Sequence, residues 1–127
     1  MEEGLLKLGE RIIGAAMRVH TVLGPGLLES AYEVCLHHEP CLSGLHVERQ
    51  VNLPIRYDGL SLASGYRLDL VVERQIVLEL KAVEKLSALH TAQLISYLKL
   101  GGYPVGYLLN FNVIHLRDGI RRIMNKH

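Results

Sequence analysis

The segment from Tyr66 to Lys81 constrains the fold of this chain more strongly than any other part of the sequence. Leucine, isoleucine and valine dominate on both sides of Glu73-Arg74-Gln75. Two apolar runs separated by three polar residues predict a β-hairpin with a three-residue loop. Because side chains alternate between the two faces of a strand, a shared face is expected on the first strand. That face consists of Tyr66, Leu68, Leu70 and Val72.

Three charged residues in this hairpin, Asp69, Glu79 and Lys81, are candidates for a functional site. Alternation places Glu79 and Lys81 on one face of the second strand. A three-residue loop pairs Val72 with Ile76 and therefore places Asp69 opposite Glu79. Facing carboxylates repel each other by roughly several tenths of a kcal/mol in a sheet. A divalent cation between them would remove this repulsion, and Mg²⁺ prefers oxygen ligands of this kind.

Two alternatives to a metal site remain open from the pattern alone. The charged residues could lie on the solvated face of a half-buried hairpin, where carboxylates and lysines also form structural ion pairs. A two-residue loop would shift the register by one residue and point Asp69 away from Glu79.

The whole chain is expected to form one domain spanning residues 1–127, large enough to bury a core. With 49% hydrophobic and 21% charged residues, its composition is typical of soluble globular proteins. A net charge of +1 argues mildly against tight non-specific binding of nucleic acid. No apolar run reaches the length of a membrane span, and no signal peptide is evident, so a cytoplasmic protein is expected. The two cysteines lack metal-ligand spacing and are expected to be reduced thiols.

Hydrophobic periodicity predicts an α/β chain in the order α-α-β-β-β-α-β, with helices packed against a mixed sheet. Pro54 favours an edge position for the first strand, and Asp58-Gly59 predicts a hairpin turn after it. Ser87 is a plausible N-cap of the third helix. The segment 120–124 could be a helix or a strand, because its period does not decide. The expected helices cover residues 5–23, 27–38 and 86–100, and the strands 47–57, 60–72, 76–83 and 105–110.

Four further residues could join the charged residues of the hairpin, although each also has a structural explanation. Gln93 and Tyr97 are spaced i, i+4 and so project from one helix face, but Tyr97 could equally be a core aromatic. Glu29 near a helix N-terminus could simply interact with the helix dipole. Arg67 shares the predicted face of Asp69 and would lie opposite Lys81, an arrangement that suits an anionic phosphate above a metal.

Several of these segments resemble a known family. Residues 26–32, Gly-Leu-Leu-Glu-Ser-Ala-Tyr, are similar to the Gly-x-x-Glu-x-x-Tyr signature of the GxxExxY family. The resemblance continues, in the expected order, over nearly the whole chain. That family is placed in the PD-(D/E)xK nuclease superfamily, although Leu68 stands where the superfamily motif has proline. The other matching segments are residues 65–70, 79–83, 93–97 and 110–112.

This resemblance implies a restriction-endonuclease-like core, with a four-stranded mixed sheet flanked by helices. It implies Asp69 and Glu79 as metal ligands and Lys81 as the catalytic lysine. Glu29 would be the acidic residue of the first core helix, and Gln93 with Tyr97 a Gln-x-x-x-Tyr element.

The expected function is therefore hydrolysis of phosphodiester bonds in nucleic acid, with Mg²⁺ as the ion and Mn²⁺ as a substitute. DNA is the expected substrate and RNA the alternative, and a homodimer or a partner chain is expected to help grip a duplex. The rival hypothesis is a catalytically inert nuclease-fold module that binds nucleic acid or protein.

Overall fold

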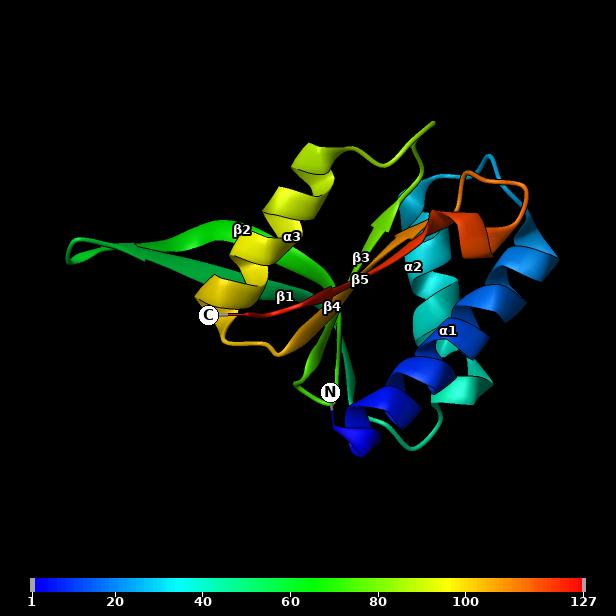
Figure 1. The fold of residues 1–127 in the computed structure, drawn as a ribbon, viewed down its shortest axis with the longest axis horizontal. Coiled ribbons are helices and arrows are strands. Elements are labelled where there is room, and N and C mark those ends of the chain that lie inside the picture. The colour runs from blue at the N-terminus through cyan, green and yellow to red at the C-terminus, as the bar shows by residue number, and fades with distance from the viewer. Residues whose placement is uncertain (1, 127) are drawn as a thin grey trace.

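The computed structural model describes residues 2–126, in which a mixed sheet separates two helices on one face from one helix on the other (Figure 1). The sheet has five strands in the order β1-β2-β3-β4-β5, of which β3 and β4 are parallel and the other neighbours antiparallel. The helices are α1 (Glu3–Leu23), α2 (Glu29–His38) and α3 (Ala88–Gly101), with short 3₁₀ turns at Pro40–Leu42 and Leu116–Gly119. The strands are β1 (Val47–Tyr57), β2 (Leu60–Val72), β3 (Ile76–Lys81), β4 (Val105–Asn110) and β5 (Ile120–Met124).

The core is divided between the two faces of the sheet. On one face α1 and α2 pack over apolar residues that include Leu70, Leu78 and Tyr107. On the other face α3 packs over a second cluster that includes Val71, Val77 and Leu108. Helix α3 also connects the parallel strands β3 and β4, which cannot be joined by a short turn. No helix within residues 2–126 is long and apolar enough to cross a membrane.

The prediction of a four-stranded sheet is wrong, because residues 120–124 form a fifth strand. The element order is accordingly α-α-β-β-β-α-β-β. β5 pairs with β4 from Leu109↔Ile120 to Val105↔Met124. Its close return depends on Gly119, because a Cβ at that position would collide with the carbonyl oxygen of Asn110.

The ends of the predicted helices and strands shift by a few residues. The second helix starts at Glu29 rather than Leu27, the third strand ends at Lys81, and α3 starts at Ala88. Ser87 is the N-cap of α3, as predicted: its hydroxyl accepts a hydrogen bond from the His90 N–H at 3.2 Å. His90 Nδ1 in turn accepts from the Ser87 N–H at 3.0 Å, which completes a capping box.

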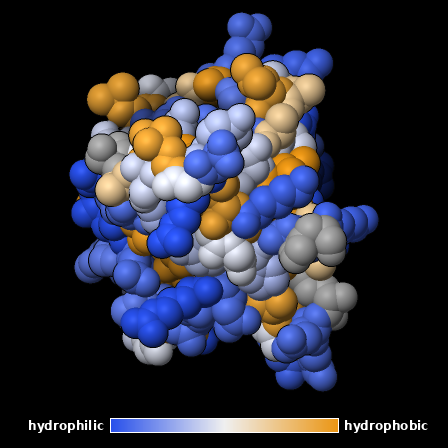
Figure 2. All heavy atoms as spheres, turned by 90° about the vertical axis from the view of Figure 1, so that its left-hand side faces the viewer, coloured by the Kyte–Doolittle hydropathy of each residue, from blue (hydrophilic) through white to orange (hydrophobic). Residues whose placement is uncertain are grey.

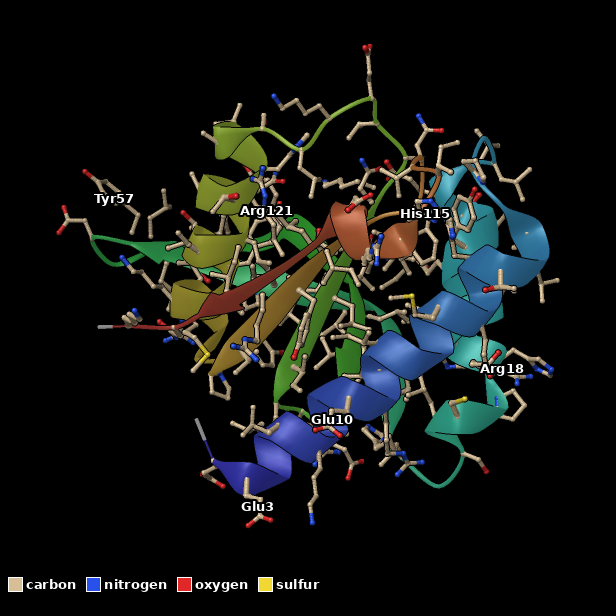
Figure 3. The ribbon with its side chains drawn as sticks, turned by 45° about the vertical axis from the view of Figure 1, so that its right-hand side comes forward. Glu3, Glu10, Arg18, Tyr57, His115 and Arg121 are labelled. Atoms are coloured by element: carbon tan, nitrogen blue, oxygen red, sulfur yellow. The ribbon has the colours of Figure 1, made fainter. Side chains whose placement is uncertain are left out.

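β1 is an edge strand, as Pro54 predicts, and the β1–β2 register shifts at that proline. Beyond the shift the two strands continue as a hairpin arm, whose far end extends past α3 (Figure 1). The arm ends in the predicted Asp58-Gly59 turn, where both residues have positive φ. Figure 3 shows Tyr57, which is 74% exposed, at the far end of the arm. Figure 2 views the molecule from this end, where hydrophobic side chains lie scattered among hydrophilic ones.

Candidate active site

The sheet opens between β2 and β3 at the predicted carboxylates. The three-residue loop is confirmed, and the two strands pair from Val72↔Ile76 to Leu70↔Leu78. Beyond that point the ladder ends, and Leu68 and Leu80, which a continued register would pair, are not paired. Side chains replace the missing backbone bonds. The Asp69 N–H donates to Glu79 Oε2 at 2.9 Å, and the Leu80 N–H donates to Asp69 Oδ2 at 2.9 Å. The two carboxylates therefore face each other across the opening, as the register predicts.

Asp69 also marks a change of face along β2. Leu68 packs in the cluster under α3, whereas Leu70 packs in the cluster under α1 and α2. The prediction that these leucines share a face is therefore wrong. On the neighbouring strand β1, Gln50 adopts a left-handed backbone conformation, with φ of 51°. Arg49↔Leu70 and Val51↔Leu68 pair on either side, but Gln50 and Asp69 between them do not.

The electrostatics of this opening suit a cation. Glu79 is only 6% exposed, and burial, followed by the charge of the facing Asp69, raises its pKa from 4.5 to about 8. Burial also raises the pKa of Asp69, and the negative charge of Glu33 acts in the same direction. Lys81 follows Glu79 by two residues on β3, and its positive charge opposes the rise in the pKa of both carboxyls. Burial and mutual repulsion therefore favour a bound cation or proton over two unpaired negative charges at this opening.

The donor set fits a hard divalent ion. Hydrogen bonds from the backbone hold Asp69 Oδ2 and Glu79 Oε2 in place. Within residues 2–126 no donor is directed at the remaining oxygens, Asp69 Oδ1 and Glu79 Oε1, which are thus available as ligands. Carboxylate oxygens are the ligands that Mg²⁺ prefers.

Glu29 approaches the same opening from α2, on the opposite side of the sheet from α3. Its Oε2 accepts a hydrogen bond from the Ala82 N–H at 3.1 Å, directly after Lys81. The charge of Glu29 acts on Asp69 and Glu79, where it raises the pKa of each. Glu29 thus contacts the backbone at the end of β3, whereas the hydrogen bonds across the opening are those of the Asp69 and Glu79 side chains.

The Gly-x-x-Glu-x-x-Tyr motif has a local explanation in the loop before α2. Gly26 has φ of 98°, a conformation that favours glycine. The Tyr32 hydroxyl donates to the Gly24 carbonyl at 2.6 Å and accepts from the Leu27 N–H at 3.1 Å. The Tyr32 ring stacks on Phe111, with centroids 4.4 Å apart. Phe111 N–H donates to the Lys81 carbonyl at 2.9 Å, so the motif connects the start of α2 to the end of β3.

The remaining predicted residues divide into one near the carboxylates and two on the surface. Tyr97 is 7% exposed and packs against Tyr66, with centroids 5.8 Å apart. Burial raises the pKa of the Tyr97 hydroxyl, followed by the charge of Glu79, so Tyr97 lies on the α3 side of the site. Gln93 and Arg67 are exposed, and within residues 2–126 neither forms a hydrogen bond or ion pair with the carboxylates.

Two residues whose hydrogen bonds connect the elements of this region were not predicted from the sequence. Glu33 is buried rather than solvated, and Arg49 and Gln50 donate hydrogen bonds to it. Its spacing of four residues from Glu29 places both on one face of α2, which was a usable signal. Asn110, at the end of β4, accepts from the Val83 N–H at 3.1 Å and donates to the Val83 carbonyl at 2.9 Å. It ties the segment after Lys81 to β4.

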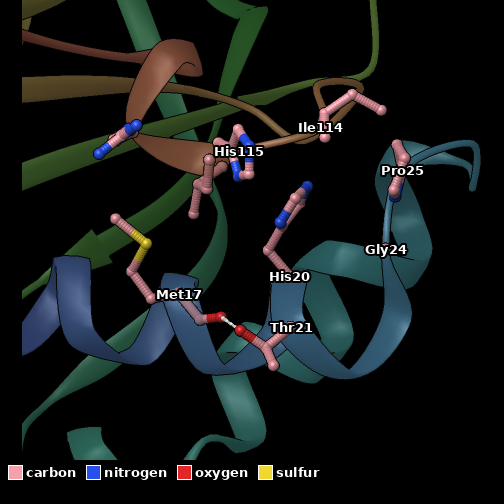
Figure 4. Close-up of a pocket in the computed structure, with 9 residues that line it drawn as sticks. Met17, His20, Thr21, Gly24, Pro25, Ile114 and His115 are labelled. Atoms are coloured by element: carbon pink, nitrogen blue, oxygen red, sulfur yellow. Dashed lines mark hydrogen bonds between the residues drawn. The ribbon is translucent and has the colours of Figure 1, made fainter.

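A separate cavity of about 550 Å³ lies between the end of α1 and the segment after β4 (Figure 4). His20 and His115 line it, and His20 Nε2 is 2.8 Å from the carbonyl oxygen of Val113. None of the predicted site residues lines this cavity.

Comparison with known families agrees with the geometry at the sheet opening. The family model of the PD-(D/E)XK nuclease superfamily matches residues 6–123. The chain therefore belongs to this superfamily, whose members are generally nucleases. An α/β fold with a mixed sheet between helices is consistent with that membership. No curated protein and no solved structure matches the chain.

Proposed function

We propose that this protein is a Mg²⁺-dependent nuclease that hydrolyses phosphodiester bonds, with DNA as the expected substrate and Mn²⁺ as a substitute ion. The observation that carries the proposal is the convergence of Asp69 and Glu79 beside Lys81 at the sheet opening. Each carboxylate has one oxygen held by the backbone and one oxygen free for a ligand. We also propose that the chain is a member of the GxxExxY family, which its motifs resemble.

In this mechanism Asp69 and Glu79 would hold the ion through the oxygens that the backbone leaves free. When bound, Mg²⁺ would polarise a phosphoryl oxygen and lower the pKa of a water. Lys81 would orient that water or stabilise the negative charge that develops on the phosphate. Glu29, whose Oε2 accepts from the Ala82 N–H, would help to hold a second ion or a water of the ion.

The flanking residues have supporting roles in the proposal. Tyr97 of α3, which is 7% exposed, is proposed to position the carboxylates or to contact the scissile strand. Gln93 and Arg67 are exposed, so they are proposed to contact the substrate strand rather than the ion. A homodimer or a partner chain is proposed to help this small domain grip a duplex.

The test is cleavage of labelled single- and double-stranded DNA and RNA in Mg²⁺, Mn²⁺ or EDTA. The wild type is expected to cleave DNA only with a divalent ion. Asp69→Asn and Glu79→Gln are expected to lower the rate by at least about 100-fold, because each removes charge that binds the ion. Circular dichroism should show that both variants remain folded.

Asp58→Asn is the matched control, since it makes the same chemical change in the exposed turn of the hairpin arm. It should cleave at the wild-type rate. Wild-type cleavage rates in Asp69→Asn or Glu79→Gln would contradict the proposal. Binding of nucleic acid by the wild type without any cleavage would favour the inert nuclease-fold module.

A further inference from the structure

A buried polar cluster lies beside Asp69 and is not used by the mechanism above. At its centre is Glu33 of α2, whose side chain is 6% exposed. Glu33 Oε2 accepts from Arg49 Nε at 3.2 Å, and Glu33 Oε1 accepts from Gln50 Nε2 at 2.7 Å. Arg49 also contributes a second nitrogen 3.2 Å from Oε2, so each oxygen of Glu33 has a defined partner.

The cluster acts on the backbone at the point where Asp69 leaves the regular sheet. Gln50 is the residue opposite Asp69, and its left-handed φ of 51° interrupts the β1–β2 ladder there. The pairs on either side of it are formed. On the other side the β2–β3 ladder ends at Leu70. Asp69 is therefore unpaired on both sides, and β2 changes face there.

Stability of the fold alone does not explain why Gln50 is left-handed and bonded to a buried Glu33. A left-handed conformation at a residue other than glycine costs roughly 1–3 kcal/mol unless the surroundings hold it. Glu33 also adds a negative charge beside a carboxyl that is already partly buried. An extended Gln50 would restore the ladder pair with Asp69 and avoid the backbone strain. Irregularities of this kind in a strand are over-represented next to active sites, where they redirect a side chain.

We propose that Glu33 and Gln50 are positioning residues: their hydrogen bond holds β1 in the left-handed turn that frees Asp69 to face Glu79. This inference rests on the proposed function, in which Asp69 and Glu79 bind a divalent ion. Neither positioning residue touches the ion or the substrate. They act through the direction of the Asp69 side chain, as outer partners of metal ligands commonly do.

The experiment is calorimetric titration of the metal-free protein with Mn²⁺, together with thermal unfolding. Gln50→Ala is the informative variant, because the bond to Glu33 is lost while positive φ remains strained for alanine. It also leaves the net charge unchanged, so electrostatic attraction of the cation is the same. Gln50→Gly serves as a second variant, since it loses the same bond but accepts positive φ without strain.

Gln50→Ala is expected to bind Mn²⁺ at least about 10-fold more weakly than the wild type, and Gln50→Gly more tightly than Gln50→Ala. Thermal unfolding checks that both variants remain folded during the titration. Gln75→Ala is the matched control, since it makes the same chemical change at an exposed residue of the loop at the other end of the β2–β3 pair. It should bind Mn²⁺ with wild-type affinity.

Wild-type affinity in both Gln50 variants would overturn the inference. If Asp69→Asn loses Mn²⁺ binding in the same experiment, the proposed metal site stands and only the positioning role fails. If the wild type itself shows no saturable binding, the proposed function fails and the positioning role fails with it.

Discussion

At the scale of single residues, the site consists of carboxylates that the fold makes difficult to ionise. Glu79 is desolvated and faces Asp69, and both features favour the protonated acid over the carboxylate. Lys81 and two backbone N–H donors offset this preference only in part. In the proposed function a bound cation would take the place of the proton that burial favours on Glu79.

The raised pKa of Glu79 predicts a pH-dependent stability of the metal-free protein. A folded-state pKa of about 8, above the usual 4.5, means that the contribution of Glu79 to stability is fully present below pH 4.5. It is lost as the pH rises towards 8. The loss is on the order of a few kcal/mol, because one pKa unit corresponds to about 1.4 kcal/mol. Glu79→Gln, which stays neutral, should not show this loss.

The measurement is urea unfolding in EDTA at pH 5 and pH 8. The free energy of unfolding of the wild type should fall relative to Glu79→Gln between these values. Glu10→Gln, a change at an exposed carboxylate on α1 (Figure 3), should follow the wild type at both pH values. Parallel pH dependence of wild type and Glu79→Gln would show that burial does not suppress the ionisation of Glu79.

The nearness of Asp69 and Glu79 along the two strands could be predicted, because it follows from the length of the loop between two apolar runs. The role of Glu33 could not be predicted in the same way. Its burial depends on β1 lying beside α2, which brings Arg49 and Gln50 to it from a distant part of the sequence. The left-handed φ of Gln50 has no local signal either, since glutamine lies within an otherwise regular strand pattern.

At the scale of elements, the loop between α1 and α2 fixes how Glu29 reaches the end of β3. The Tyr32 hydroxyl closes this loop, and the Tyr32 ring stacks on Phe111 next to Lys81. Tyr32 is fully buried and thus joins the loop before α2 to the segment after β4.

Tyr32→Phe is expected to lower the free energy of unfolding by about 1–2 kcal/mol, because it removes a buried hydroxyl with two partners while keeping the stacked ring. Denaturant unfolding measures this change. Tyr57→Phe is the matched control on the exposed hairpin arm and should change stability by less than about 0.5 kcal/mol. Equal effects of the two substitutions would mean that the Tyr32 hydroxyl does not support the loop.

Periodicity predicted the type of most elements. It did not predict which side chains of β2 share a face, or that residues 120–124 form a fifth strand. Strict alternation along β2 fails at Asp69, where Leu68 and Leu70 enter different clusters. Residues 120–124 are too few for a period to separate helix from strand. Their conformation depends on pairing with β4 and on the room that Gly119 leaves for the return of the chain.

At the scale of the whole molecule, the sheet has a continuous core on both faces but divides between its second and third strands. Helix α2 from one side and helix α3 from the other bring Glu29 and Tyr97 towards this division. The overall layers were predictable from hydrophobic patterning. The division itself was not, because it depends on side chains replacing backbone hydrogen bonds across the two strands.

The most direct test of the central claim is a crystal structure of the protein soaked in Mn²⁺, with the anomalous signal of manganese recorded. The account predicts an anomalous peak between Asp69 and Glu79, about 2 Å from one carboxylate oxygen of each residue. Crystals of Asp69→Asn should lack it. A wild-type map at saturating Mn²⁺ with no peak between these two residues would contradict the account.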